Sequence, residues 1–249
     1  MKHVVGITVA LPQEAYALFG RLGWSRQEGF PVKAERFKNL LAVVAISGQG
    51  RERACKAAEF LLRSNPLFML NLGVAGALVE ELSTGDLFTP SLLTDGKSKA
   101  GVDSDAYKSV SQLLRTQGFK LHDGLLVTCD RTIDSPAAKA ELYQKTGAYA
   151  VDMEAFGIAQ ACSGFGVPIY IVKAVTDSLH QTIPRAITSC LTETGQISLV
   201  RFTVTILSRP WLVPKLLEMQ KSFKSAVFSL EQVKSVLSAN LSRNITSSC

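Results

Sequence analysis

The chain has 249 residues, 47% of them hydrophobic and 19% charged, and a formal net charge of +6. This length and composition suffice for one globular domain with a single large core. The sequence contains no apolar run of the roughly 18 to 20 residues that a membrane-spanning helix requires. Its apolar stretch at residues 4–11 is too short for a secretory signal core with a cleavage site, so we expect a cytoplasmic protein.

The spacing of the cysteines and histidines and the distribution of charge limit the possible classes of protein further. The five cysteines include no C-x-x-C pair, which favours reduced thiols, and the three histidines are not spaced as metal ligands. We therefore expect neither a metal nor another cofactor. From residue 201 onward there are seven basic and two acidic residues, a net +5 of the chain's +6. The preceding part is nearly neutral, which argues against nucleic-acid binding.

In the first half of the chain, apolar strands alternate with helices and with turns of small residues. The predicted strands span 3–10, 32–37, 40–46 and 68–72, and the predicted helices span 12–22 and 52–63. Pro12 fits a first helical position, which places Glu14 in the first turn. A glutamate there also has an ordinary explanation, because it complements the helix dipole. The small-residue turns 47–50 and 73–76 let backbone amides or a flat ligand approach closely, although plain tight turns are the alternative.

The second half continues this alternation. Residues 95–105 are polar and predict a surface loop, and 130–136 predict another loop. The predicted helices are 106–117, 136–147 and 188–207, and a strand is predicted at 124–129.

Residues 148–178 contain the most informative pattern. They predict a strand at 148–151, a helix at 153–162 and a strand at 169–175. Asp152 can cap the helix, and Glu154 then lies in its first turn. Asp177 follows the carboxyl end of the buried strand, where open α/β sheets bind ligands. Taken singly, each carboxylate is also ordinary as a cap or turn residue.

Five short motifs occur in order along the chain. They are ALPQE (10–14), SGQG (47–50), NLGVAG (71–76) with Gly85-Asp86 beyond, VDMEA (151–155) and VKAVTD (172–177). Together they resemble the nucleoside phosphorylase and nucleosidase superfamily, and most closely its methylthioadenosine/S-adenosylhomocysteine nucleosidases. No single motif is specific to this superfamily, but the occurrence of all five in the family's order over residues 3–207 is specific to it. The resemblance implies a three-layer α/β/α fold with a mixed central β-sheet, and a homodimer.

The resemblance also implies roles in cleavage of a purine–ribose bond. Asp177 would protonate the departing purine, and Glu14 would be the general base for water. Glu154 would accept hydrogen bonds from the ribose hydroxyls above an apolar floor, Met153. The other implied substrate-binding residues are Gly48, Val74, Ala75, Gly76, Ile133 and Thr176. Asp at position 177 goes with 6-amino purines in this superfamily, so adenine is implied. Related nucleosidases place an aromatic residue on the purine near Thr132, where this chain has none.

Hydrolysis and phosphorolysis both fit these residues. Phosphorylases of the superfamily carry arginines near the first glycine loop and at the end of the central strand, but 10–12 and 71–73 lack them. Arg51 and Arg53 are expected on a helix surface. We therefore favour hydrolytic release of adenine from nucleosides with a 5′ substituent that the sequence does not identify. A non-catalytic nucleoside-binding relative is the alternative, and the presence of Glu14 argues against it.

Residues 208–249 are expected to form a basic extension beyond a catalytic domain at 1–207. Two amphipathic helices are predicted, near 215–228 and 230–241. The simpler interpretation is a helical pair packed on the domain or on a partner subunit. The alternative is a segment that contacts an anionic membrane surface. Together with Asp130-Arg131 and the 151–154 motif, this extension is also similar to hopanoid-associated nucleosidases, a phosphorylase-like branch acting on an adenosyl lipid.

Overall fold

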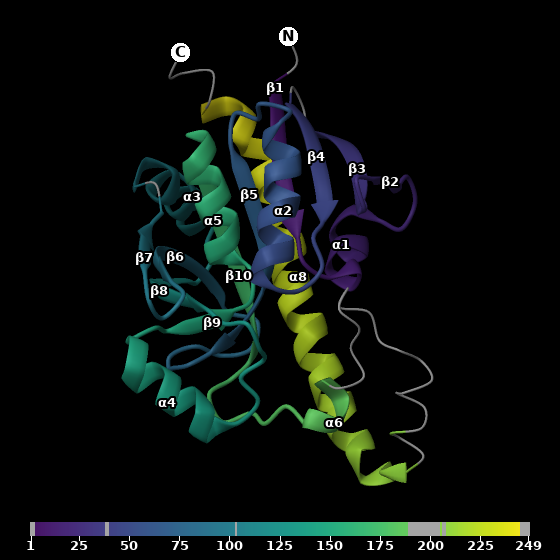
Figure 1. Cartoon of the computed structure of the whole chain (residues 1–249), viewed down its shortest axis with the longest axis vertical. Coiled ribbons are helices and arrows are strands. Elements are labelled where there is room, and N and C mark those ends of the chain that lie inside the picture. The colour runs from purple at the N-terminus through teal and green to yellow at the C-terminus, as the bar shows by residue number, and fades with distance from the viewer. Residues whose placement is uncertain (1–2, 38–39, 103, 189–204, 206–207, 245–249) are drawn as a thin grey trace.

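The computed structural model describes residues 3–37, 40–102, 104–188, 205 and 208–244 (Figure 1). The strands are β1 (His3–Val9), β2 (Ser25–Gln27), β3 (Phe30–Phe37), β4 (Leu40–Ile46), β5 (Met69–Ala77), β6 (Leu87–Thr94), β7 (Lys99–Gly101), β8 (Leu121–Thr128), β9 (Ala150–Asp152) and β10 (Ile169–Asp177). The helices are α1 (Pro12–Phe19), α2 (Arg51–Leu62), α3 (Ser104–Thr116), α4 (Pro136–Thr146), α5 (Ala155–Phe165), α6 (Arg185–Thr188), the 3-10 turn η1 (Pro210–Leu212) and α8 (Val213–Asn244).

The strands form one mixed sheet in the order β10-β6-β8-β9-β5-β1-β4-β3-β2, with β7 paired to β6. Because β10 also pairs with β5, the strands β10, β6, β8, β9 and β5 close into a ring. Strands β1, β4, β5 and β10 run parallel to one another. Their carboxyl ends therefore meet at one edge of the sheet, which is where ligands bind in α/β folds.

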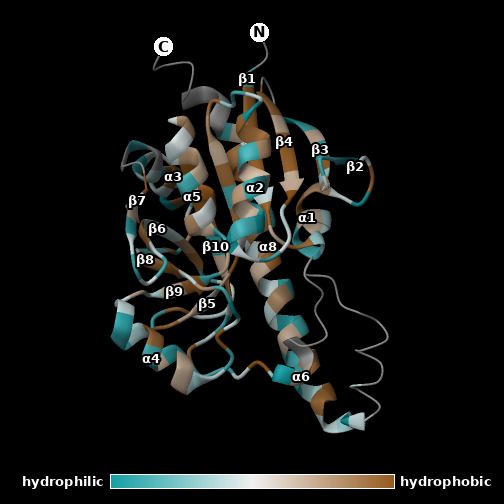
Figure 2. Ribbon diagram, viewed as in Figure 1, coloured by the Kyte–Doolittle hydropathy of each residue, from teal (hydrophilic) through white to brown (hydrophobic). Residues whose placement is uncertain are grey.

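Helices cover both faces of this sheet. One hydrophobic core lies between the sheet and the helices α2 and α5, and a second core lies between the opposite face and α1, α3 and α8 (Figure 1). Neighbouring residues of β10 alternate between them, with Ile171 in the first core and Val172 in the second, as the pleat requires. Strands β1 and β4 are accordingly hydrophobic along most of their length in Figure 2. The predicted three-layer α/β/α fold with a mixed sheet is confirmed.

The C-terminal segment forms one 32-residue helix, α8, so the prediction of two separate helices there was wrong. Its residues Ala226, Leu230, Val233 and Leu237 are fully buried at helical spacing, in the same core as α1 and β1. The division at 207/208 stays a prediction, but the helix beyond it shares a core with the sheet. No helix of the described residues is long and apolar enough to cross a membrane.

Other predicted boundaries also need correction. Residues 73–76 were expected to form a loop but belong to β5, because they pair with β10 and β9. The polar segment 95–105 contains β7, whose backbone pairs with β6. Most of the helix predicted at 188–207 lies outside the described residues.

Candidate active site

A cavity of about 940 Å³ lies where the parallel strands end. Nine of the ten predicted site residues line it, namely Glu14, Val74, Ala75, Gly76, Ile133, Met153, Glu154, Thr176 and Asp177. The tenth, Gly48, does not line the cavity, although its neighbour Gln49 does. The fold thus gathers side chains that are more than 160 positions apart in sequence around one space.

Glu14 lies in the first turn of α1 as predicted, but it is fully buried and not a surface residue. Its Oε2 accepts a hydrogen bond from the backbone N–H of Leu11 at 3.0 Å. Its Oε1 is buried without a hydrogen-bond partner among the described residues. Burial raises the pKa of Glu14 to about 7, although the Leu11 hydrogen bond and the nearby Lys173 act in the opposite direction. A carboxylate of this kind is suited to take a proton near neutral pH.

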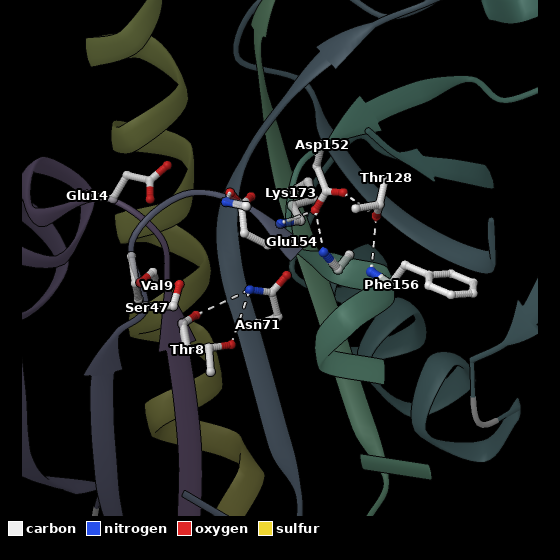
Figure 3. Close-up of polar contacts among 12 residues, drawn as sticks. Thr8, Val9, Glu14, Ser47, Asn71, Thr128, Asp152, Glu154, Phe156 and Lys173 are labelled. Carbon is white, nitrogen blue, oxygen red and sulfur yellow. Dashed lines mark hydrogen bonds and ion pairs between the residues drawn. The ribbon is translucent and has the colours of Figure 1, made fainter. Parts of the chain in front are cut away.

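Glu154 occupies the N-cap position just before α5, one step earlier than the predicted first turn. Its Oε1 accepts a hydrogen bond from the backbone N–H of Gly50 at 3.0 Å, which ties the first glycine turn to the site. Burial and, after it, the neighbouring Asp152 raise the pKa of Glu154 to about 7, although Lys173 acts in the opposite direction. The side chain lines the cavity close to Asp152 and Lys173 (Figure 3).

An ion pair between Asp152 and Lys173 lies behind these carboxylates (Figure 3). Lys173 Nζ is 2.8 Å from Asp152 Oδ2, and the lysine is only 1% exposed. Thr128 Oγ1 donates to Asp152 Oδ1 at 2.6 Å, and Thr128 in turn accepts from the N–H of Phe156. The N–H of Ala155 donates to Asp152 Oδ2 at 2.9 Å, which confirms the predicted cap. Every oxygen of Asp152 is thus held by a donor.

Sequence reasoning overlooked Lys173. A charged residue in the middle of an otherwise apolar, buried strand was the available signal, because lysine is almost never fully buried without a partner. Burial lowers the pKa of Lys173, but the charges of Asp152 and Glu154 outweigh it, and the net shift is upward. Lys173 therefore supplies a fixed positive charge among three acidic side chains.

Removing this charge should destabilise the protein strongly. Replacing Lys173 by Met leaves Asp152 buried without its cation, and breaking a buried pair in this way costs about 3–5 kcal/mol. Lys56→Met is the matched control, because Lys56 forms an exposed ion pair with Glu52 at 2.6 Å, and breaking a solvent-exposed pair should change the free energy of unfolding little. Urea unfolding measures both variants. Equal losses of unfolding free energy would contradict the assigned role of Lys173.

Asp177 follows β10 as predicted and lines the cavity. Its Oδ1 accepts a hydrogen bond from Thr176 Oγ1 at 2.8 Å, and its Oδ2 lies 2.5 Å from Lys139 Nζ. A Cβ at Gly76 would come within 2.9 Å of Oδ2, so the strand β5 needs a glycine for this carboxylate to pack against it. Sequence reasoning missed Lys139, which reads as an ordinary lysine between two alanines of a helix.

The N-terminal half of α8 forms a further wall of the cavity. The lining residues from this helix are Val213, Leu216, Leu217, Met219, Gln220, Phe223 and Lys224. Phe223 is the one aromatic residue that the described part of the chain contributes to the lining, on a segment that was predicted to lie outside the catalytic domain. Near Thr132, where related enzymes have an aromatic residue, the hydroxyl instead donates to Met153 Sδ at 3.9 Å. Sequence pattern alone gave no sign that α8 reaches the site.

The arginines nearest the first glycine turn are engaged outside the cavity. Arg51 pairs with Asp95 at 2.8 Å, and Arg53 Nε donates to the carbonyl of Ser47 at 3.3 Å. The basic residues in the lining are Arg21, Arg131 and Lys224. Among the described residues, no group of three or more His, Cys, Asp or Glu side chains is placed to hold a metal ion.

Known proteins resemble this chain in sequence and in fold. A family model described as the phosphorylase superfamily matches residues 4–198. A 5′-methylthioadenosine/S-adenosylhomocysteine nucleosidase of Staphylococcus aureus is 28% identical over 202 residues, covering 70% of this chain and 86% of that protein. The corresponding nucleosidase structure from Helicobacter pylori gives a TM-score of 0.74 at 17% identity, covering 95% and 98% of the two chains.

A futalosine hydrolase structure from Helicobacter pylori gives a TM-score of 0.70 at 19% identity, covering 94% of this chain and 97% of the other. These similarities confirm the resemblance drawn from the five motifs. Because the family model spans most of the sequence, the chain belongs to the phosphorylase superfamily.

Proposed function

We propose that this protein hydrolyses the N-glycosidic bond of adenine nucleosides that carry a 5′ substituent, and releases adenine. The observation that carries the proposal is the buried Oε1 of Glu14, an unpartnered carboxylate oxygen in the same cavity as Glu154 and Asp177. A protein that only binds nucleosides has no use for such a base. The names of the related nucleosidases and of the futalosine hydrolase support this reaction class.

The reaction passes through an oxocarbenium-like state, as glycoside cleavage does. The bond from C1′ to N9 breaks, and its electron pair leaves with the purine, which takes up a proton from Asp177. Water adds to C1′ and gives its proton to Glu14. Glu154 accepts hydrogen bonds from the 2′ and 3′ hydroxyls, and Met153 offers an apolar surface to the ribose. The Glu154 carboxylate also stabilises the positive charge that develops on the sugar.

Hydrolysis is preferred over phosphorolysis because of the cations around the cavity. Phosphate binding needs unpaired cationic donors, most often arginine. Arg51 and Arg53 are turned to partners outside the cavity, and Lys173 is paired with Asp152. The lining contains four acidic side chains against three basic ones, Arg21, Arg131 and Lys224, and this charge balance disfavours an anionic nucleophile.

The deciding experiment is release of adenine from 5′-methylthioadenosine in the presence and absence of inorganic phosphate. Release at equal rates, with free methylthioribose as the second product, supports the proposal. Strict dependence on phosphate, with a sugar 1-phosphate as product, assigns a phosphorylase. No release from any 5′-substituted adenosine contradicts catalysis and favours the binding relative.

A second candidate differs in the 5′ group, which would be a long apolar chain as in an adenosyl lipid. The apolar side chains that α8 contributes to the cavity favour it, because two of them also reach the surface. Leu217 is 61% exposed and Val213 is 39% exposed, so the apolar wall continues to the outside. Membrane contact through the basic segment and a homodimer stay predictions.

A series of 5′-alkylthioadenosines from methyl to octyl distinguishes the candidates. If α8 contacts the 5′ group, kcat/KM should rise with chain length, by up to about fourfold per buried methylene at 0.8 kcal/mol each. Leu217→Gln should flatten this rise. Phe228→Gln is the matched control, because Phe228 is equally exposed on α8 but does not line the cavity. A kcat/KM that falls beyond methyl would restrict the enzyme to small 5′ groups.

A further inference from the structure

Lys139 is a fully buried lysine of α4 that none of the roles above includes. Its Nζ lies 2.5 Å from Asp177 Oδ2, 2.6 Å from the carbonyl oxygen of Ser178 and 3.4 Å from the carbonyl oxygen of Gln181. Asp177 lines the cavity, whereas Lys139 does not. The ammonium is therefore placed directly behind the carboxylate that faces the purine.

This arrangement leaves neither side chain free to move. An ammonium has three N–H donors, and Lys139 has three acceptors in reach. Asp177 is held on its other oxygen by the Thr176 hydroxyl and is packed against Gly76. Taking two charges out of water costs free energy that their attraction only partly returns, so a buried pair is weak evidence for a role in stability. Its place beside the cavity indicates a role in the reaction.

We infer that Lys139 is a positioning residue for the acid step, which it serves by fixing Asp177 and by holding the proton that the purine receives. This inference rests on the proposed function. The pair holds one transferable proton between Nζ and Oδ2. When C1′–N9 breaks, Lys139 passes a proton to the Asp177 carboxylate, and N7 takes a proton from the carboxyl so formed, which leaves a neutral amine and a carboxylate. The amine regains a proton from water, while Glu14 releases the one that it took, so protons balance.

The lysine also explains how a carboxylate held by two donors can act as an acid. Both oxygens of Asp177 accept hydrogen bonds, Oδ2 from Lys139 and Oδ1 from Thr176, so neither oxygen presents a proton toward the cavity in this arrangement. A donor that is fixed 2.5 Å away supplies it without rearrangement. Lys139 thus supplies Asp177 with a proton, as bulk water would supply one to an exposed carboxyl group.

Two substrates that differ only in the leaving group test this inference. One is the 5′-alkylthioadenosine that the wild type cleaves fastest, whose purine needs a proton to leave. The other is a 4-nitrophenyl riboside with the same 5′ group, whose phenolate leaves without one. Lys139→Met should lower kcat for the adenosine about 10²–10⁴-fold, the usual share of general acid catalysis, and should leave nitrophenolate release nearly unchanged. Lys145→Met, at an exposed position on the same helix, should change neither.

The other outcomes each overturn a different statement. Unchanged adenine release in Lys139→Met overturns the role of Lys139 alone. A parallel loss with both substrates assigns Lys139 a purely structural role. The nitrophenyl riboside also guards against misfolding, because a Lys139→Met variant that still releases nitrophenolate near the wild-type rate has kept the fold of the cavity. A wild type that cleaves no adenine nucleoside overturns the proposed function and this step with it.

Discussion

Glu14→Gln should lower kcat about 10²–10⁴-fold, because the amide cannot accept the proton of the attacking water. The variant keeps the size of the side chain and an oxygen that can accept the Leu11 hydrogen bond, so the fold should be retained. Unlike Lys139→Met, this variant should lose adenine and nitrophenolate release together, since both reactions need the water. Adenine release under saturating substrate measures the effect. Turnover close to that of the wild type would remove Glu14 from the mechanism.

The pH dependence of the same variant gives an independent check. The pKa of Glu14 is about 7 in the folded protein and 4.5 in its ordinary state. The base works when ionised, so wild-type kcat/KM should rise with pH through about 7, together with ionisation of Glu154. Between pH 4.5 and 7 the folded state binds more protons than the unfolded chain, so Glu14 makes the protein less stable as pH rises.

Glu14→Gln removes this contribution. The variant should therefore melt at a higher temperature than the wild type at pH 8, and the difference should vanish at a pH well below 4.5, where Glu14 is protonated in both states. Thermal melts at the two pH values measure it. A residue that is buried for function at a cost in stability behaves in this way. Equal melting temperatures of Glu14→Gln and the wild type at pH 8 would mean that burial of the ionised Glu14 does not destabilise the protein.

Asp177→Asn should lower kcat for adenine nucleosides by a similar factor, about 10²–10⁴, while leaving nitrophenolate release nearly intact. The amide has no acidic proton for N7. Its oxygen can still accept from Lys139, and its NH₂ can donate to the Thr176 hydroxyl, so the melting temperature should fall less than in a variant that lacks both contacts. Parallel assays on the two leaving groups measure this selectivity.

Asp177→Ala serves as the contrasting variant. It leaves the Lys139 ammonium buried with two carbonyl oxygens only, and such an unpaired charge should lower the melting temperature well below that of Asp177→Asn. Equal melting temperatures for the Asn and Ala variants would show that the pair adds nothing to the fold. Full adenine release by Asp177→Asn would assign the acid to another group.

Most strands of the sheet, the helices of the catalytic layers and the three carboxylates of the cavity were predictable from the sequence for identifiable physical reasons, whereas β2, β6 and β7 were not predicted. Buried strands such as β4 and β10 are runs of apolar residues, and Pro12 and Asp152 mark where α1 and α5 begin. Because parallel strands end at the same edge of the sheet, the residues that follow β1 and β10 could be expected to lie close together there. Glu14 and Asp177 follow from that rule and from the family motifs.

Partners that depend on tertiary packing were not predictable in this way. Lys139 approaches Asp177 only because α4 packs beneath the loop after β10, and no periodic pattern encodes that contact. Residues 73–76 look like a loop because glycine and alanine have low strand propensity, yet pairing with two strands overrides this local preference. The contact of α8 with the cavity was not predicted, because a basic, mildly amphipathic segment resembles a surface extension in sequence. Only the structure shows that its apolar side packs on the sheet.

The position of α8 also has a consequence for how the protein is made. A ribosome delivers the sheet and both catalytic carboxylates well before it delivers the helix that covers one face of the sheet. Until residues 226–237 emerge, the part of this face that α8 covers stays exposed to water, and such a surface attracts chaperones and other nascent chains. The helix segment that lines the cavity is therefore made first, and the segment that closes the core follows directly after it.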